Sequence, residues 1–107
     1  MDLKEKLKLY KRIVEKAGVA LKGKTMFYTS SNGYMFSQLN KAGEIGIRLS
    51  KKDTLDFDSK FGAQPFKSYG ATMREYVLIP DNLLDDIHLT ASLLQKGYNY
   101  VNSLPPK

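Results

Sequence analysis

The spacing of the apolar residues changes twice along this chain of 107 residues, and this change constrains the fold more than any single motif does. Over 3–17, and again over 87–101, apolar side chains recur at steps of three and four residues, which predicts two helices that each bury one face. Over 44–50 apolar and polar residues alternate, which predicts a strand with one buried face. Helices at both ends with strands between them predict an α+β fold, in which helices cover an antiparallel sheet.

Turn residues divide the middle of the chain into strands. The dipeptide Asn32-Gly33 is a strong hairpin signal, because both residue types tolerate positive φ. It predicts that strands over 25–30 and 34–39 pair antiparallel. A second turn over 40–43 then leads into the alternating strand.

A short helix is predicted over 51–61. Ser50, followed three residues later by Asp53, has the form of a capping box at its start, and a glycine follows its end. Phe57 and Phe61 lie one turn apart in this helix. We expect both to anchor it on the sheet rather than to line a ligand site.

The second half of the chain adds a strand and a closing helix. A loop over 65–70 precedes a strand over 73–79, and Pro80 begins a helical region that continues almost to the end. The predicted order is α-β-β-β-α-β-α, with an antiparallel sheet of four strands, and room for a fifth, packed by helices. The length suits one domain over 1–107.

The composition removes most catalytic chemistry. The chain has no Cys and one His, so disulfides, thiol nucleophiles and thiolate metal sites are excluded, and a zinc site is not expected. The single histidine, His88, follows Asp85 and Asp86 near the start of the last helix, where we expect a surface residue and no catalytic triad. We therefore expect no enzyme, no cofactor and no metal. No apolar run approaches the roughly 20 residues of a spanning helix, so we expect a cytoplasmic protein with no membrane partner.

The net charge of +6 is concentrated at the N-terminus, where residues 1–24 carry eight basic and three acidic side chains. The outer face of the first predicted helix holds Lys4, Lys8, Lys11 and Arg12. Two interpretations stay open for this face: a solvated surface, or a nucleic-acid interface whose cationic groups contact phosphates. Lys6 alone falls within the apolar arc, where we expect its stem to lie flat and its ammonium to reach water.

Residues 18–25 match the phosphate-loop pattern G-x-x-x-x-G-K-[ST], but the surrounding elements are in the wrong order for that loop. A phosphate loop follows a buried strand and leads into the N-terminus of a helix. Here a helix precedes Gly18 and a strand follows, so a phosphate would meet the partially negative end of the helix. We interpret Gly18 as a helix C-cap and do not expect nucleotide hydrolysis.

The open face of the predicted sheet is a second candidate binding surface. Arg48 is expected there, joined by Tyr28, Tyr34 or Tyr76. Arg and Tyr side chains could stack on unpaired bases or form the centre of a protein interface. The alternative is that these tyrosines are half-buried strand residues with hydrated hydroxyl groups. An edge strand of the sheet could instead pair with a second copy of the chain.

Several short runs of sequence, spread over about residues 22–104, form a distributed pattern. These runs are Met26-Phe27, Asn32-Gly33-Tyr34-Met35-Phe36, Ile45-Gly46-Ile47-Arg48-Leu49, Phe61-Gly62-Ala63-Gln64-Pro65-Phe66 and Arg74-Glu75-Tyr76-Val77-Leu78-Ile79-Pro80-Asp81-Asn82-Leu83-Leu84. The pattern resembles the N-terminal domain of the TfoX/Sxy family. The resemblance implies an α+β fold with an antiparallel sheet, a bacterial cytoplasmic setting, and kinship with regulators of natural competence, which act on transcription. It supplies no catalytic residues.

We therefore expect a small non-enzymatic module that binds a protein partner, or a second copy of itself, within a regulatory context. Nucleic-acid binding through the basic first helix is the alternative. Titration with DNA at two salt concentrations separates them, because phosphate contacts give a steep dependence of affinity on salt.

Overall fold

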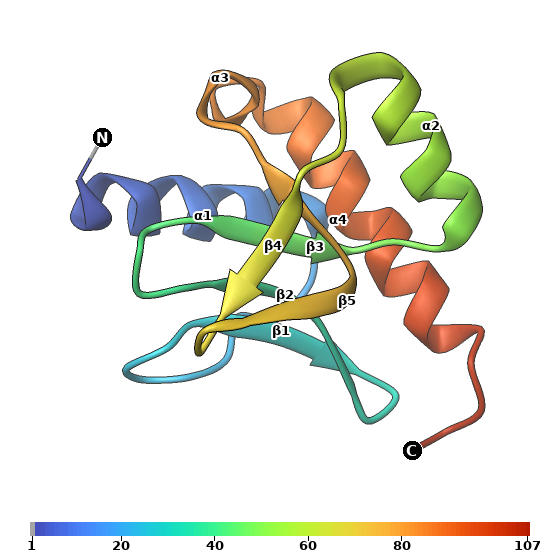
Figure 1. Ribbon diagram of the computed structural model, residues 1–107. Coiled ribbons are helices and arrows are strands. Elements are labelled where there is room, and N and C mark those ends of the chain that lie inside the picture. Colours follow the sequence, from blue (N-terminus) through green and yellow to red (C-terminus); the bar gives the residue numbers. More distant parts are fainter. Residues whose placement is uncertain (1) are drawn as a thin grey trace.

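The computed structural model of the chain describes residues 2–107, which form four helices and five strands (Figure 1). The helices are α1 (Leu3–Ala17), α2 (Lys51–Phe61), α3 (Asp81–Leu84) and α4 (Ile87–Asn102). The strands are β1 (Tyr28–Ser31), β2 (Tyr34–Leu39), β3 (Ile45–Arg48), β4 (Pro65–Ser68) and β5 (Ala71–Ile79). They form one antiparallel sheet in the order β1-β2-β3-β5-β4. The predicted α+β class, with an antiparallel sheet packed by helices, is confirmed.

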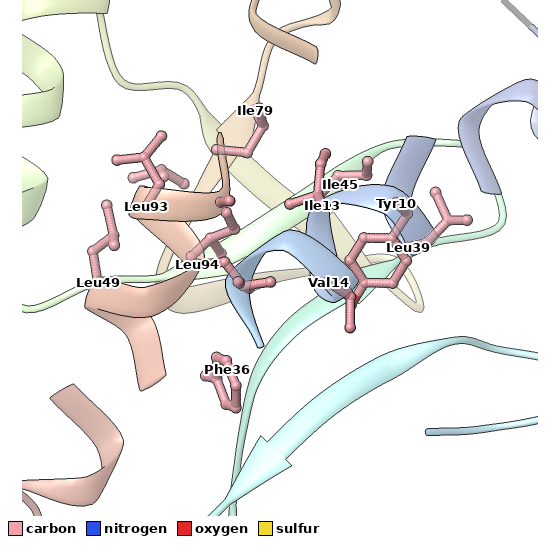
Figure 2. Close-up of a cluster of buried hydrophobic side chains, with 14 of the residues drawn as sticks. Tyr10, Ile13, Val14, Phe36, Leu39, Ile45, Leu49, Ile79, Leu93 and Leu94 are labelled. Carbon is pink, nitrogen blue, oxygen red and sulfur yellow. The ribbon is translucent and has the colours of Figure 1, made fainter. Parts of the chain in front are cut away.

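One face of the sheet carries the hydrophobic core. α1 and α4 pack against each other there, and α4 also packs on β1, β2 and β3. The strand register places Ile45 beside Leu39 and Ile79, so these three side chains share this face. Figure 2 shows how the helices fill it, with Tyr10, Ile13 and Val14 from α1, Leu93 and Leu94 from α4, and Phe36, Leu39, Ile45 and Ile79 from the strands.

Two local predictions are confirmed in detail. α2 spans 51–61 as predicted, and the Ser50 hydroxyl accepts a hydrogen bond from the amide of Asp53 at 3.1 Å. Gly18 caps α1 in the left-handed conformation, with a φ of 76°. The residues that match the phosphate-loop pattern therefore start at the C-terminus of a helix, and β1 follows them.

The predicted loop over 65–70 is wrong, because this segment forms β4 and the turn of a hairpin with β5. Tyr69 and Gly70 make the turn, and both have positive φ, 55° and 74°. A tyrosine is rarely found in the left-handed region, so the sequence carried no clear turn signal here. The closing helical region is also divided in two: the short α3 ends at Leu84 with Asp85 as its C-cap, and Asp86 caps α4 by accepting a hydrogen bond from the amide of Leu89 at 3.0 Å.

Two predictions about side-chain packing are also wrong. Phe57 is buried as expected, but Phe61 is 39% exposed, and its ring packs against the ring of Phe57. Lys6 does not reach water: it is buried, donates a hydrogen bond to the carbonyl of Gly43 at 2.7 Å, and pairs with the carboxylate of Asp81 at 2.6 Å. A buried ammonium needs such partners, and this one links α1 to the β2–β3 turn and to α3.

A bend in β5 turns the β4–β5 hairpin across the second face of the sheet (Figure 1). Glu75 has a φ of 68° at the bend. The pairing also shifts there, because Pro65 lies opposite Val77 whereas Lys67 lies opposite Thr72. The extra residues in β5 form a large bulge, and bulges of this kind increase strand bending.

Phe66 of β4 closes the second face of the sheet. Its side chain is fully buried and lies against Gly46 of β3, where a Cβ atom would come within 2.4 Å of the phenyl ring. The ring also stacks on Tyr76, with the ring centroids 5.8 Å apart. The sheet face predicted to be open is therefore covered at its centre, and the room for Phe66 depends on a glycine in β3.

Candidate binding groove

Arg48 and Tyr34, two residues of the predicted binding surface, lie together but bind each other within the protein. The guanidinium of Arg48 lies over the rings of Tyr34 and Tyr100, 5.4 and 5.6 Å from their centroids. Glu75 accepts hydrogen bonds from Arg48 Nε at 2.9 Å and Nη2 at 2.5 Å, and one from the Tyr100 hydroxyl. The charge of Arg48 and two of its five N–H donors are thus used inside the chain.

The C-terminal residues complete this cluster. The Tyr34 hydroxyl donates to the carbonyl of Pro105 at 2.6 Å, and the side-chain amide of Asn32 donates to two carbonyl oxygens at the end of α4 and just beyond it, both at 2.9 Å. We call this region the closed end of the sheet; it consists of Asn32, Tyr34, Arg48, Glu75, Tyr100 and residues 104–107.

The electrostatics of the closed end favour this paired state. Partial burial acts to raise the pKa of Glu75, but the hydrogen bonds from Tyr100 and Arg48, with the charges of Arg48 and Arg74, hold the pKa below its ordinary value. The hydrogen bond to Glu75 in turn raises the pKa of the Tyr100 hydroxyl. The charged Glu75 neutralises Arg48, and the neutral Tyr100 donates a hydrogen bond to the same carboxylate. These contacts indicate a structural role.

The other two tyrosines of the predicted surface do not join Arg48 in an open face. Tyr28 is half-buried in β1, where its main chain pairs with Lys22 on one side and Gln38 on the other. Tyr76 lies against Phe66, and its hydroxyl donates to a main-chain carbonyl at 2.9 Å. All three tyrosines are half-buried, as the alternative interpretation expected, and among the described residues the folded hairpin lies where an open stacking surface would be.

The basic residues of α1 lie beside an apolar groove, which we call the α1 groove. It has a volume of about 220 Å³. Leu3 and Leu7 form its wall on α1, Met26 and Phe27 form the opposite wall, and Leu39 at the end of β2 is buried beneath it. The remaining lining residues are Thr25, Asn40 and Lys41. The groove lies at the end of the sheet where β2 leads into β3, opposite the closed end.

Basic side chains border the α1 groove. Residues four apart follow one row along a helix, so Leu3, Leu7 and Lys11 share one row and Lys4, Lys8 and Arg12 share the next. The ammonium of Lys11 lies 5.6 Å from the centroid of the Phe27 ring, so this lysine contacts the wall opposite α1. Within residues 2–107, no carboxylate lies within salt-bridge distance of these four basic side chains.

A second, more polar compartment of about 360 Å³ shares Met26, Asn40 and Lys41 with the α1 groove. Its other lining residues are Ala42, Glu44, Lys67, Ser68, Tyr69 and Gly70. The hydroxyl of Tyr69 donates to the sulfur of Met26 at 3.3 Å, so the tip of the β4–β5 hairpin reaches the loop before β1. We call the α1 groove and this polar compartment together the open end of the sheet.

Sequence reasoning found the lysines of the open end but missed the groove. It placed Leu3 and Leu7 in the inward-facing stripe of the helix, whereas Leu3 is 52% exposed. It also placed Met26 and Phe27 within the first strand, which begins only at Tyr28. The available signal was the position of the two leucines on the lysine-rich side of the stripe. The opposite wall is a loop whose path cannot be read from sequence.

Other candidate chemistry is sparse in the described part of the chain. His88 is exposed in the first turn of α4, as predicted. Among residues 2–107 no three acidic or histidine side chains gather into a cluster that could hold a metal ion. No helix in the same range is both long and apolar enough to cross a membrane.

Comparisons of this chain with protein-family models, with curated proteins and with solved structures found no match.

Proposed function

We propose that this protein is a small non-enzymatic interaction module, and that its α1 groove binds an acidic amphipathic segment of a partner protein. The observation that carries the proposal is the juxtaposition of an apolar groove with unpaired basic side chains along its α1 wall. A segment that buries apolar side chains in the groove would set its carboxylates beside those cations.

The size of the groove favours side chains of a partner over a free metabolite. Pockets for small molecules usually have volumes of about 300–1,000 Å³ and hold several converging polar groups. The α1 groove, at about 220 Å³, is smaller and is lined mainly by leucine, methionine and phenylalanine side chains. It has room for one or two apolar anchors. Burying one leucine or phenylalanine contributes about 1.5–3 kcal/mol, which suits a regulated, reversible interaction.

The resemblance to the TfoX/Sxy family supports a regulatory setting for this interaction in a bacterial cytoplasm. Within that proposal the partner is another protein of the same regulatory system. A second copy of this chain is the simplest alternative occupant, and the oligomeric state in solution tests it.

Nucleic-acid binding is the second candidate function, and the exposed row of Lys4, Lys8 and Arg12 is the observation that favours it. Such a row can contact successive phosphates and release their counterions. It gives no role to the apolar groove beside it, so we rank it second. Binding of duplex or single-stranded DNA that weakens steeply with salt would support this candidate.

The matched variants Leu3→Asp and Leu55→Asp test the proposed function. Both residues are exposed leucines on helices, at 52% and 62%, but only Leu3 lines the groove. An aspartate in the first turn of α1 also suits the helix dipole, so the Leu3 variant is expected to fold. Short random peptides displayed on phage are selected on the wild-type protein, and the affinities of the selected peptides are measured for each variant.

The selected peptides are expected to combine apolar anchors with acidic residues. Leu3→Asp should weaken their binding about tenfold or more, because it removes apolar contact and adds a like charge, whereas Leu55→Asp should leave it unchanged. Failure to enrich any peptide, selection of basic peptides, or equal affinity of Leu3→Asp and wild type would contradict the proposal.

A further inference from the structure

One of the residues that line the polar compartment of the open end carries a buried hydroxyl group without a hydrogen-bond partner among the described residues. Ser68, the last residue of β4, lines this compartment and is only 7% exposed. Within residues 2–107, its Oγ atom has no hydrogen-bond partner. A buried polar atom without a partner costs stability, so native proteins keep few of them.

Other buried hydroxyl groups of this protein are paired. Thr29 and Ser37 are fully buried on the core face, and their hydroxyls bond to each other at 2.5 Å. Ser37 also bonds to the hydroxyl of Tyr10 at 2.6 Å. The fold therefore satisfies the hydroxyls of its core, and Ser68 at the open end is an exception.

A second unpaired polar atom lies close to the same compartment. Gln38 is 4% exposed, and its Oε1 atom has no hydrogen-bond partner among the described residues. Its Nε2 atom donates to the sulfur of Met26 at 2.8 Å, and Met26 lines both parts of the open end. Both of the unpaired buried oxygens thus belong to the surroundings of the open end.

We infer that the polar compartment binds the main chain of the same partner segment whose apolar side chains enter the α1 groove, and that the Ser68 hydroxyl, which is closed off from solvent in the free protein, turns toward the compartment to bond one of its peptide groups. This inference rests on the proposed function. The two compartments share three lining residues and therefore adjoin, so one segment can occupy both. A serine hydroxyl both donates and accepts, and every peptide group offers an N–H or a C=O group.

The charges in the polar compartment favour a neutral group over an ion. Its lining includes Lys41 and Lys67 but also the carboxylate of Glu44, which accepts a hydrogen bond from Asn40 at 3.1 Å. Charges of both signs disfavour a ligand that carries only one sign. The Tyr69 side chain, 79% exposed at the hairpin tip, offers a large surface beside the main chain of the segment.

Ser68→Ala is the variant that tests this inference, with Ser59→Ala on the exposed side of α2 as its matched control. Removing an unpaired hydroxyl is expected to leave the thermal midpoint unchanged or raise it slightly. The same change should weaken binding of a selected peptide about fivefold to tenfold, the usual effect of losing one hydrogen bond. Ser59→Ala should alter neither property.

A double-mutant cycle locates the contact on the peptide. The selected peptide is shortened by one residue at each end in turn, and each form is titrated into the wild-type protein and Ser68→Ala. Shortening at the end that reaches the compartment should weaken binding to the wild-type protein by the same factor as Ser68→Ala, and should have no further effect on that variant.

The outcomes separate this inference from the proposed function. Unchanged affinity of Ser68→Ala, together with weakened binding of Leu3→Asp, would overturn the inference and leave the proposed function standing. Unchanged affinity of Leu3→Asp would overturn both. A loss of thermal stability in Ser68→Ala would show that its hydroxyl is paired in the free protein, and would also overturn the inference.

Discussion

The two ends of the sheet differ in how their polar groups are paired. At the closed end Arg48 and Tyr100 both donate hydrogen bonds to Glu75, and the hydroxyl of Tyr34 donates one to the carbonyl of Pro105. At the open end Ser68 and Gln38 keep buried oxygens without a partner, and Lys4, Lys8 and Lys11 of α1 lie within salt-bridge distance of no carboxylate among the described residues. Both ends carry aromatic and cationic side chains, so composition alone does not distinguish them.

This difference indicates where stability and binding are located. A cluster whose members pair internally gains little from a partner, because a partner would first have to break those contacts. Groups that remain unpaired cost free energy in the isolated chain and regain it on binding. Of two regions with similar residues, the less satisfied one is therefore the better candidate for recognition.

The largest effect is expected from Phe66→Ala, which removes the side chain that holds the β4–β5 hairpin over Gly46. Truncating a fully buried phenylalanine costs about 3–5 kcal/mol of unfolding free energy. Here it should also loosen the β4–β5 hairpin, which carries Ser68. Denaturant unfolding measures the free energy, and hydrogen exchange over 65–72 reports the loosening of the hairpin.

The control is Phe61→Ala, since that ring is 39% exposed, and its loss should cost less than about 1 kcal/mol. Equal costs for the two variants would mean that Phe66 does not hold the hairpin.

An intermediate effect is expected at the closed end from Glu75→Gln. The pKa of Glu75 is lowered in the folded protein, so its stabilising contribution is complete above the ordinary value of 4.5 and is lost as the pH falls through the lowered pKa. Because the Glu75 side chain is 38% exposed and solvent screens the pair, the variant should lose only about 1 kcal/mol near neutral pH. The wild-type protein and the variant should converge in acid, where a protonated Glu75 resembles Gln. Unfolding measured as a function of pH tests this, and a gap that persists in strong acid would argue against the charge pair.

The smallest effect is expected from Gln38→Met at the open end. The substitution keeps the approximate shape of the side chain. It removes an unpaired buried oxygen together with the weak hydrogen bond to the sulfur of Met26, so the unfolding free energy should stay within about 0.5 kcal/mol of wild type or rise. Tyr34→Phe at the closed end is the comparison, because it removes a hydroxyl that is bonded to Pro105 and should cost about 1 kcal/mol. If removing the amide of Gln38 costs more than removing the hydroxyl of Tyr34, the contrast between the two ends is wrong.

The part of the fold that depends on local signals could be predicted from the sequence. The capping box at Ser50 and the glycine after α1 fixed two helix ends, because each signal acts through neighbouring main-chain groups. The hairpin at Tyr69-Gly70 was missed, since a tyrosine with positive φ is favoured by no local rule. Its conformation is imposed by contacts that β4 makes far away in sequence, above all that of Phe66 with Gly46.

The candidate site was predictable to a smaller extent. The cationic row of α1 followed from its helical spacing, but the groove beside it needs the loop that holds Met26 and Phe27. The predicted open face around Arg48 was wrong because a bend in β5 folds the sheet over itself. The alternation of apolar and polar residues shows which face of a single strand is buried. It does not show where a pair of strands bends.

By itself the sequence determined the α+β class, the position of most helices and strands, and the concentration of positive charge on the first helix. These follow from periodicity and capping, which act within a few residues. Only the tertiary structure decided that Arg48 is neutralised inside the chain while the lysines of α1 border a groove. Whether a polar group has a hydrogen-bond partner depends on distant segments that meet only after folding. In this protein Arg48 and Glu75 meet in this way at the closed end, whereas the hydroxyl of Ser68 and the side-chain oxygen of Gln38 have no partner among the described residues at the open end.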